Sequence, residues 1–215
     1  MELACGTGRL TLPIARQQLA ISGIDRSRAM LATAREKAAA GDLSVDFIHA
    51  DMRRFSLDRR FAMIFVAMNS LLHLTTVEDI RACLSSVQRH LLPGGRFIFD
   101  IFNPNLHLLA TQQRRRFTLT ELQRDDQEDE PVRVEEAIVY DARNQIARAT
   151  IYLVADDHTE VELPPLRLRQ IFPQELVALL ALEGMALEAR YGDFERGPFT
   201  TRSAHQVCIS RPIPN

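Results

Sequence analysis

The sequence has little of what several classes of protein require. Its three cysteines are scattered and form no CxxC pair, so neither a zinc site nor a disulfide framework is indicated. No apolar run approaches the roughly 20 residues of a membrane helix. The net charge of −2 lacks the basic excess typical of nucleic-acid binding. We therefore expect a protein of a reducing, cytoplasmic compartment, with no metal, membrane or nucleic acid among its partners.

Repeats and low-complexity linkers are also missing, and 215 residues suit one domain, or one domain with an elaboration. In the first hundred residues, helical patterns alternate with short apolar runs. Ser27 is a candidate N-cap, and Gly41 a helix stop. The patterns predict helices over 10–19, 28–40 and 76–91, a turn over 92–95, and strands over 20–25, 45–49, 61–68 and 96–101. The run 61–68 is continuously apolar, which indicates a strand buried on both faces. We predict an α/β fold with a Rossmann-like, doubly wound, mostly parallel sheet.

After Pro104 the alternation stops. Residues 111–136 are highly charged, with RRR at 114–116 and DDQEDE at 125–130, and we interpret them as a solvated loop or strand edge. The remaining patterns predict antiparallel strands over 134–140 and 147–154, an interrupted strand over 161–172, a helix over 173–184, and strands over 186–191 and 205–210. The predicted parts are a core at 1–110, an inserted antiparallel β-sheet at 111–172, and a segment at 173–215 that completes the core with an antiparallel final strand.

A glycine-rich turn stands at the start of the chain, in MELACGTGRL. Gly6 and Gly8 allow close approach of a ligand to the backbone, and the helix that follows presents unpaired amides. Asp25 ends the next strand, where a carboxylate can accept hydrogen bonds from both ribose hydroxyls of a nucleoside. After the third strand, Asp51 could accept from an exocyclic amine, with Met52 flat against an apolar ring. A nucleoside ligand is implied.

Two cofactor classes use such a turn. A dinucleotide fold usually shows GxGxxG, but Thr11 stands at the third glycine position. The carboxylate of Glu2 would repel a pyrophosphate, whereas it suits the ammonium and sulfonium of a methionine-like tail. These residues favour S-adenosylmethionine over a nicotinamide dinucleotide.

Four segments together carry a resemblance to a known family. ELACGTGRL resembles motif I of the class I S-adenosylmethionine-dependent methyltransferases, and GIDRSRAML resembles their second motif. ADMRRF resembles the third, and LLPGGRFIFDIFNP the stretch through the fifth strand. The closing YGDFERGPFTTRSAHQVCISR is similar to the end of bacterial members that act on small molecules. The resemblance covers residues 1–104 and the C-terminal stretch.

The resemblance implies a role for individual residues. Glu2 would hold the methionine side of the cofactor, Asp25 the ribose, and Asp51 with Met52 the adenine. Residues 67–69 would lie near the transferred methyl group. Met30 fits a core position better than a cofactor contact, although the resemblance places it in the cofactor site. The implied cofactor site consists of Glu2, Ala4, Gly6, Thr7, Gly8, Asp25, Arg26, Met30, Asp51, Met52, Ala67, Met68 and Asn69.

Candidates for catalysis and acceptor binding follow from the chemistry of methyl transfer, which needs an in-line nucleophile and a base only for some acceptors. His73 is the candidate general base, and a histidine bonded to backbone is the alternative. Asn69 could position the substrate or cap the following turn. Tyr191, Arg167 and Arg169 are candidate substrate contacts.

The leading hypothesis is a methyltransferase acting on an N or O nucleophile of a small molecule, with a homodimer formed through the inserted sheet. A non-catalytic cofactor-binding or structural protein is the alternative. An NAD(P)-dependent oxidoreductase is disfavoured by Thr11 and by the lack of a Tyr-Lys pair. Since the first strand of this family is central and follows a helical lid, we interpret the chain as truncated at its start. We expect a short first strand, an exposed cleft and reduced cofactor affinity.

Overall fold

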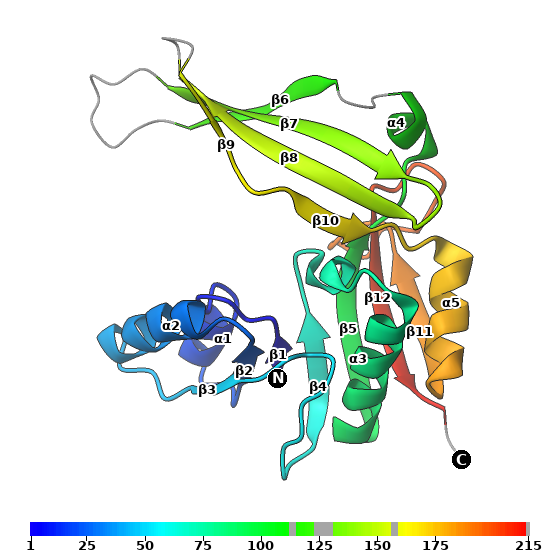
Figure 1. Cartoon of the computed structure of the whole chain (residues 1–215). Coiled ribbons are helices and arrows are strands. Elements are labelled where there is room, and N and C mark those ends of the chain that lie inside the picture. Colours follow the sequence, from blue (N-terminus) through cyan, green and yellow to red (C-terminus); the bar gives the residue numbers. More distant parts are fainter. Residues whose placement is uncertain (112–114, 123–130, 156–158, 214–215) are drawn as a thin grey trace. The chain divides into compact units, whose positions relative to one another are not determined.

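The computed structural model describes residues 1–111, 115–122, 131–155 and 159–213 (Figure 1). They form two compact units. The first comprises Met1–Asn103 and Phe172–Asn215, and the second comprises Pro104–Ile171. Arg114 and the acidic run DDQEDE, which sequence analysis assigns to a solvated loop or strand edge, lie outside the described residues.

The first unit contains a seven-stranded sheet in the order β11-β12-β5-β4-β1-β2-β3. Its strands are β1 (Glu2–Leu3), β2 (Ser22–Asp25), β3 (Asp46–His49), β4 (Phe61–Val66), β5 (Leu91–Phe102), β11 (Met185–Tyr191) and β12 (His205–Pro212). The first five strands pair in parallel, while β12 runs antiparallel to both β5 and β11. The predicted fold class, with its antiparallel final strand, is confirmed.

The helices of this unit are α1 (Thr11–Arg16), α2 (Arg28–Ala40), the short 3₁₀ helix η1 (Ser70–His73), α3 (Val77–His90) and α5 (Pro173–Leu182). Two of them, α2 and α3, begin at a side-chain cap. The Ser27 hydroxyl accepts from the backbone N–H of Met30 at 3.3 Å, and Thr76 caps α3 in the same way. Gly41 ends α2 as predicted. The first helix is shorter than predicted, and Gln18, two residues beyond its end, has a φ of 59°.

Two predictions about the central strands were wrong. β4 is not buried on both faces: Ala62 is exposed, and Met63, which points to the other face, is 48% exposed. The predicted turn at 92–95 lies within β5, where the register with β4 shifts and Gly94 takes a φ of 76°. The strand therefore absorbs the two glycines as an irregularity. The expectation of a short first strand is confirmed.

The second unit is a five-stranded antiparallel sheet in the order β10-β8-β7-β6, with β9 pairing β8. Its elements are α4 (Leu106–Thr111), β6 (Arg116–Leu122), β7 (Val132–Asp141), β8 (Ile146–Val154), β9 (Glu160–Glu162) and β10 (Leu166–Arg169). The predicted β7–β8 hairpin is confirmed. The interrupted third strand is β9 and β10, since two prolines separate them. The helix α4 was not predicted. β6 is an edge strand with mostly exposed side chains, in agreement with the strand edge expected in this charged region.

No helix in the described part of the chain combines the length and the apolar character that crossing a bilayer requires.

Candidate functional site

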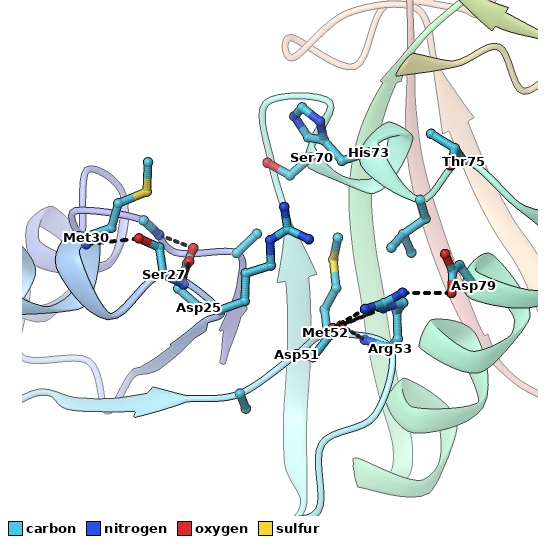
Figure 2. Close-up of a pocket in the computed structure, with 15 residues that line it drawn as sticks. Asp25, Ser27, Met30, Asp51, Met52, Arg53, Ser70, His73, Thr75 and Asp79 are labelled. Carbon is cyan, nitrogen blue, oxygen red and sulfur yellow. Dashed lines mark hydrogen bonds and ion pairs between the residues drawn. The ribbon is translucent and has the colours of Figure 1, made fainter. Parts of the chain in front are cut away.

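Two adjoining cavities lie at the carboxyl edge of the parallel strands in the first unit. The larger has a volume of about 590 Å³ and the smaller about 210 Å³. Four residues line both, and they mark the junction: Ala4, Gly6, Met30 and Ser70. The larger cavity is drawn in Figure 2 and is also lined by Asp25, Arg26, Ser27, Ala50, Asp51, Met52, Arg53, His73, Leu74, Thr75 and Asp79. The smaller is also lined by Glu2, Cys5, Thr7, Arg9, Leu10, Ala67 and Met68.

The glycine-rich turn forms the junction between the cavities. Gly6 has a φ of 54°, and Ala4 reaches the same left-handed region with a φ of 52° although it carries a Cβ. Gly8 has a φ of 79° and lines neither cavity. A Cβ at Gly8 would lie 3.0 Å from the Leu12 side chain, so this glycine is needed for the packing of α1. The turn therefore brings Ala4 and Gly6, rather than Gly8, to the cavities.

The Asp25 carboxylate ties the turn to the start of α2. One oxygen accepts from the backbone N–H of Gly6 at 2.9 Å, and the other from that of Ser27 at 2.7 Å. The side chain is only 8% exposed, which strengthens such charge-assisted bonds. Figure 2 shows Asp25 and Ser27 together at one side of the larger cavity. Asp25 is thus held in place with lone pairs left for a ligand's hydroxyl groups.

Glu2 brings a second buried carboxylate to the smaller cavity. Its residue is 4% exposed, and its carboxylate accepts a hydrogen bond from the Thr11 hydroxyl. Burial raises the pKa of Glu2, because the charged form loses its hydration there. A cation placed in the smaller cavity would stabilise the charged form.

Asp51 lies in the larger cavity, held by a guanidinium that sequence analysis missed. Arg53 donates from Nε to both oxygens of Asp51 at 3.0 Å, and from a terminal nitrogen to Asp79 at 3.0 Å. Figure 2 shows Arg53 bridging these two carboxylates. The hydrogen bonds from Arg53 hold the pKa of Asp51 below its ordinary value. Asp51 is therefore a charged acceptor at neutral pH, with its orientation set from α3 as well as β3.

The edge after β4 contributes Ala67 and Met68 to the smaller cavity, while Asn69 lines neither. The Asn69 Oδ1 atom is buried and has no hydrogen-bond partner among the described residues. Ser70, one residue on, lines both cavities and was not predicted. Its position in NSLLHL, between two candidate residues, was the signal that could have identified it.

His73 follows on η1 and lines the larger cavity only (Figure 2). Burial lowers the pKa of the imidazole, and the charge of Arg26 lowers it further. The ring is therefore neutral at physiological pH and can accept a proton.

The other candidates have different surroundings. Met30 is 49% exposed and lines both cavities, so the favoured interpretation of Met30 as a core residue is wrong. Tyr191 lies on β11 and lines neither cavity. In the second unit, Arg167 is exposed, whereas Arg169 is buried and donates to Gln145 Oε1 at 3.0 Å.

Taken together, the donor and acceptor groups suit a ligand with two chemically distinct ends. The larger cavity offers Asp25 and Asp51 as acceptors for hydroxyl and amino groups, with the apolar side chain of Met52 beside them. The smaller offers the carboxylate of Glu2 for a cation. Among the described residues, no group of three or more His, Cys, Asp or Glu side chains is placed to hold a metal ion.

Comparison with known proteins agrees with this arrangement. Residues 1–95 match the family described as a methyltransferase domain. A dTDP-3-amino-3,6-dideoxy-alpha-D-glucopyranose N,N-dimethyltransferase from Streptomyces fradiae is 30% identical over 141 residues, which are 63% of this chain and 54% of that protein. The solved structure of the CcbJ methyltransferase from Streptomyces caelestis aligns with a TM-score of 0.87 and 28% identity, over 99% of this chain and 82% of the other.

A second solved structure, of S-adenosylmethionine-bound CalS10, an amino pentose methyltransferase from Micromonospora echinaspora, aligns with a TM-score of 0.76 and 19% identity. The alignment covers 97% of this chain and 80% of the CalS10 chain. At 19% identity it shows that the two proteins share a fold. The chain spans about half the length of the curated relatives that it matches. The sheet order, the two cavities with their acidic residues, and these likenesses lead to one conclusion: residues 1–95 match a methyltransferase domain, and the chain has the fold of S-adenosylmethionine-dependent methyltransferases.

Proposed function

We propose that the protein transfers a methyl group from S-adenosylmethionine to a nitrogen or oxygen nucleophile of a small molecule. The observation that carries this proposal is the pair of adjoining cavities with Asp25 and Asp51 in one and Glu2 in the other. These three carboxylates match the hydroxyl and amino groups of the cofactor's neutral nucleoside and the cationic groups of its methionine part. When bound, S-adenosylmethionine supplies an electrophilic methyl group, so the protein need only bind and orient its two substrates.

In this proposal the residues of the larger cavity bind the nucleoside, and those of the smaller cavity bind the methionine part. Asp25 accepts from the ribose hydroxyls, and Asp51 accepts from the adenine amine while Met52 packs on the ring. Glu2 holds the ammonium group. The junction residues Ala4, Gly6, Met30 and Ser70 surround the place where nucleoside and amino acid meet, and Thr7, Arg26, Ala67 and Met68 complete the two walls.

An amine is the better supported acceptor. The Streptomyces fradiae relative is an N,N-dimethyltransferase of an amino sugar by its name. An ammonium must lose a proton before its nitrogen can attack, and the neutral imidazole of His73 is in the form that can take it.

The second unit is proposed to supply a surface for self-association. The exposed apolar side chains of Leu119, Leu122 and Val161 support this role. A cytoplasmic location accords with three free cysteines, Cys5, Cys83 and Cys208. Analytical ultracentrifugation tests self-association: a monomer at every protein concentration contradicts it.

The decisive experiment measures methyl transfer from labelled S-adenosylmethionine into a panel of matched amines and alcohols, including nucleotide-linked amino sugars and their hydroxyl counterparts. We expect label in an amine. Binding of S-adenosylhomocysteine is measured by calorimetry in parallel. Binding without transfer to any acceptor would assign the protein to the non-catalytic alternative, and absence of binding would refute the cofactor assignment.

A further inference from the structure

The backbone immediately after β4 takes an unusual conformation at two successive residues. Met68 and Asn69 have φ values of 59° and 58°, so two residues with side chains occupy the left-handed region. Asparagine tolerates this region, but Met68 is strained there, and such strain persists only where the surrounding structure compensates for it. Met68 lines the smaller cavity, and Asn69 precedes η1, which carries Ser70 and His73.

The compensating group is a single buried carboxylate on the neighbouring strand. Asp100 of β5 is 5% exposed. One of its oxygens accepts from the backbone N–H of Met68 at 2.9 Å, and the other accepts from that of Asn69 at 3.2 Å. The parallel register places it there, because Val66 pairs with Phe99 and the next residue of each strand lies at the carboxyl edge.

We propose that Asp100 is a positioning residue for methyl transfer: it fixes the left-handed Met68–Asn69 backbone and thereby the wall of the smaller cavity and the start of η1. This inference rests on the proposed function and extends it to a residue that touches neither cavity. By holding the backbone of Asn69, Asp100 also fixes where the unpartnered Oδ1 atom of that residue lies.

The test replaces Asp100 by Asn, which retains one acceptor oxygen but turns an N–H group toward the second amide. S-adenosylhomocysteine reaches both cavities, whereas methylthioadenosine lacks the amino-acid part and probes only the larger one. We expect Asp100→Asn to weaken S-adenosylhomocysteine about ten-fold and to leave methylthioadenosine unchanged. Turnover with the amine acceptor should fall about 100-fold, since a small misplacement near the reacting atoms has that effect.

Two further variants separate positioning from general destabilisation. Ser210→Ala removes a buried hydrogen bond to the Phe97 carbonyl in the same sheet, far along β12 from this edge, and should leave both affinities unchanged. Met68→Gly, combined with Asp100→Asn, should restore S-adenosylhomocysteine affinity toward that of Met68→Gly alone, because glycine adopts a positive φ without steric cost.

Equal weakening of both ligands by Asp100→Asn, or no recovery in the double variant, overturns the proposal. If Asp100→Asn does not fold, the double variant decides: a folded double variant supports the proposal, and an unfolded one shows that the core rather than the loop needs the carboxylate. If the unaltered protein binds neither ligand, it is the proposed function that has failed.

Discussion

Replacing Glu2 by Gln is expected to change cofactor affinity and protein stability in opposite directions. Glu2 is buried, with 4% of the residue exposed, and lines the smaller cavity, so the interaction of its carboxylate with an ammonium group would be little screened by water. A hydrogen bond to a charged group contributes about 1.5–3 kcal/mol, and its loss corresponds to about 10- to 150-fold weaker binding. Glutamine keeps an oxygen that can accept from the Thr11 hydroxyl, so the local packing is preserved.

The stability effect follows from the raised pKa of Glu2, whose main cause is burial. Between the unfolded and the raised folded pKa, the native state holds a proton that the unfolded chain has released. The free energy of unfolding therefore falls as pH rises through this window and remains lower above it. Glutamine does not titrate, so the variant should match the unaltered protein in acid and exceed it in stability above the raised pKa.

The assay is isothermal calorimetry with S-adenosylmethionine, together with urea unfolding of both proteins across a pH series. The difference in affinity between the two proteins should also narrow toward acid pH, because Glu2 is then protonated. Equal affinities at neutral pH would refute the assignment of Glu2 to the cationic end. Parallel stability curves across the whole pH range would refute the claim that its charge is costly.

Three further predictions concern the rest of the site. Asp25→Ala should weaken the binding of S-adenosylhomocysteine, measured by calorimetry, at least about ten-fold. Asp58→Ala is the control, because Asp58 is an exposed acid outside both cavities, and it should leave the affinity unchanged. An unchanged affinity in Asp25→Ala would exclude the ribose role. Ala4→Gly should raise the free energy of unfolding by about 0.5–1 kcal/mol in urea titration, because it relieves a left-handed φ at a smaller entropic cost; a decrease would contradict this. His73→Ala should lower kcat about 100-fold with an amine acceptor, and unchanged turnover would rule out an essential base.

Local sequence patterns predicted most of the helices and strands of the first unit, because helix caps and strand periodicity depend on residues that are neighbours along the chain. Ser27 and Gly41 bound α2 as predicted, since capping is a matter of a few adjacent atoms. Asp25 and Asp51 could be assigned to one cavity before the structure was known, because successive parallel strands end at the same edge of a sheet. Met30 was ambiguous by the same logic, since helical periodicity alone does not tell a core position from the rim of a cavity.

The remaining features depend on contacts between residues far apart in the sequence. Arg53, which binds Asp51, is also held from α3, where Asp79 accepts a hydrogen bond from the Arg53 guanidinium at 3.0 Å. Asp100 supports Met68 and Asn69 because β5 lies beside β4. The division into a larger and a smaller cavity arises in the same way, from the order of strands in the sheet. The sequence by itself determined the resemblance to a family, the fold class and the acids that line the cavities, since these follow from motifs and periodicity. Only the tertiary structure decided which groups hold those acids and the strained backbone in place, because that depends on which strands and helices become neighbours.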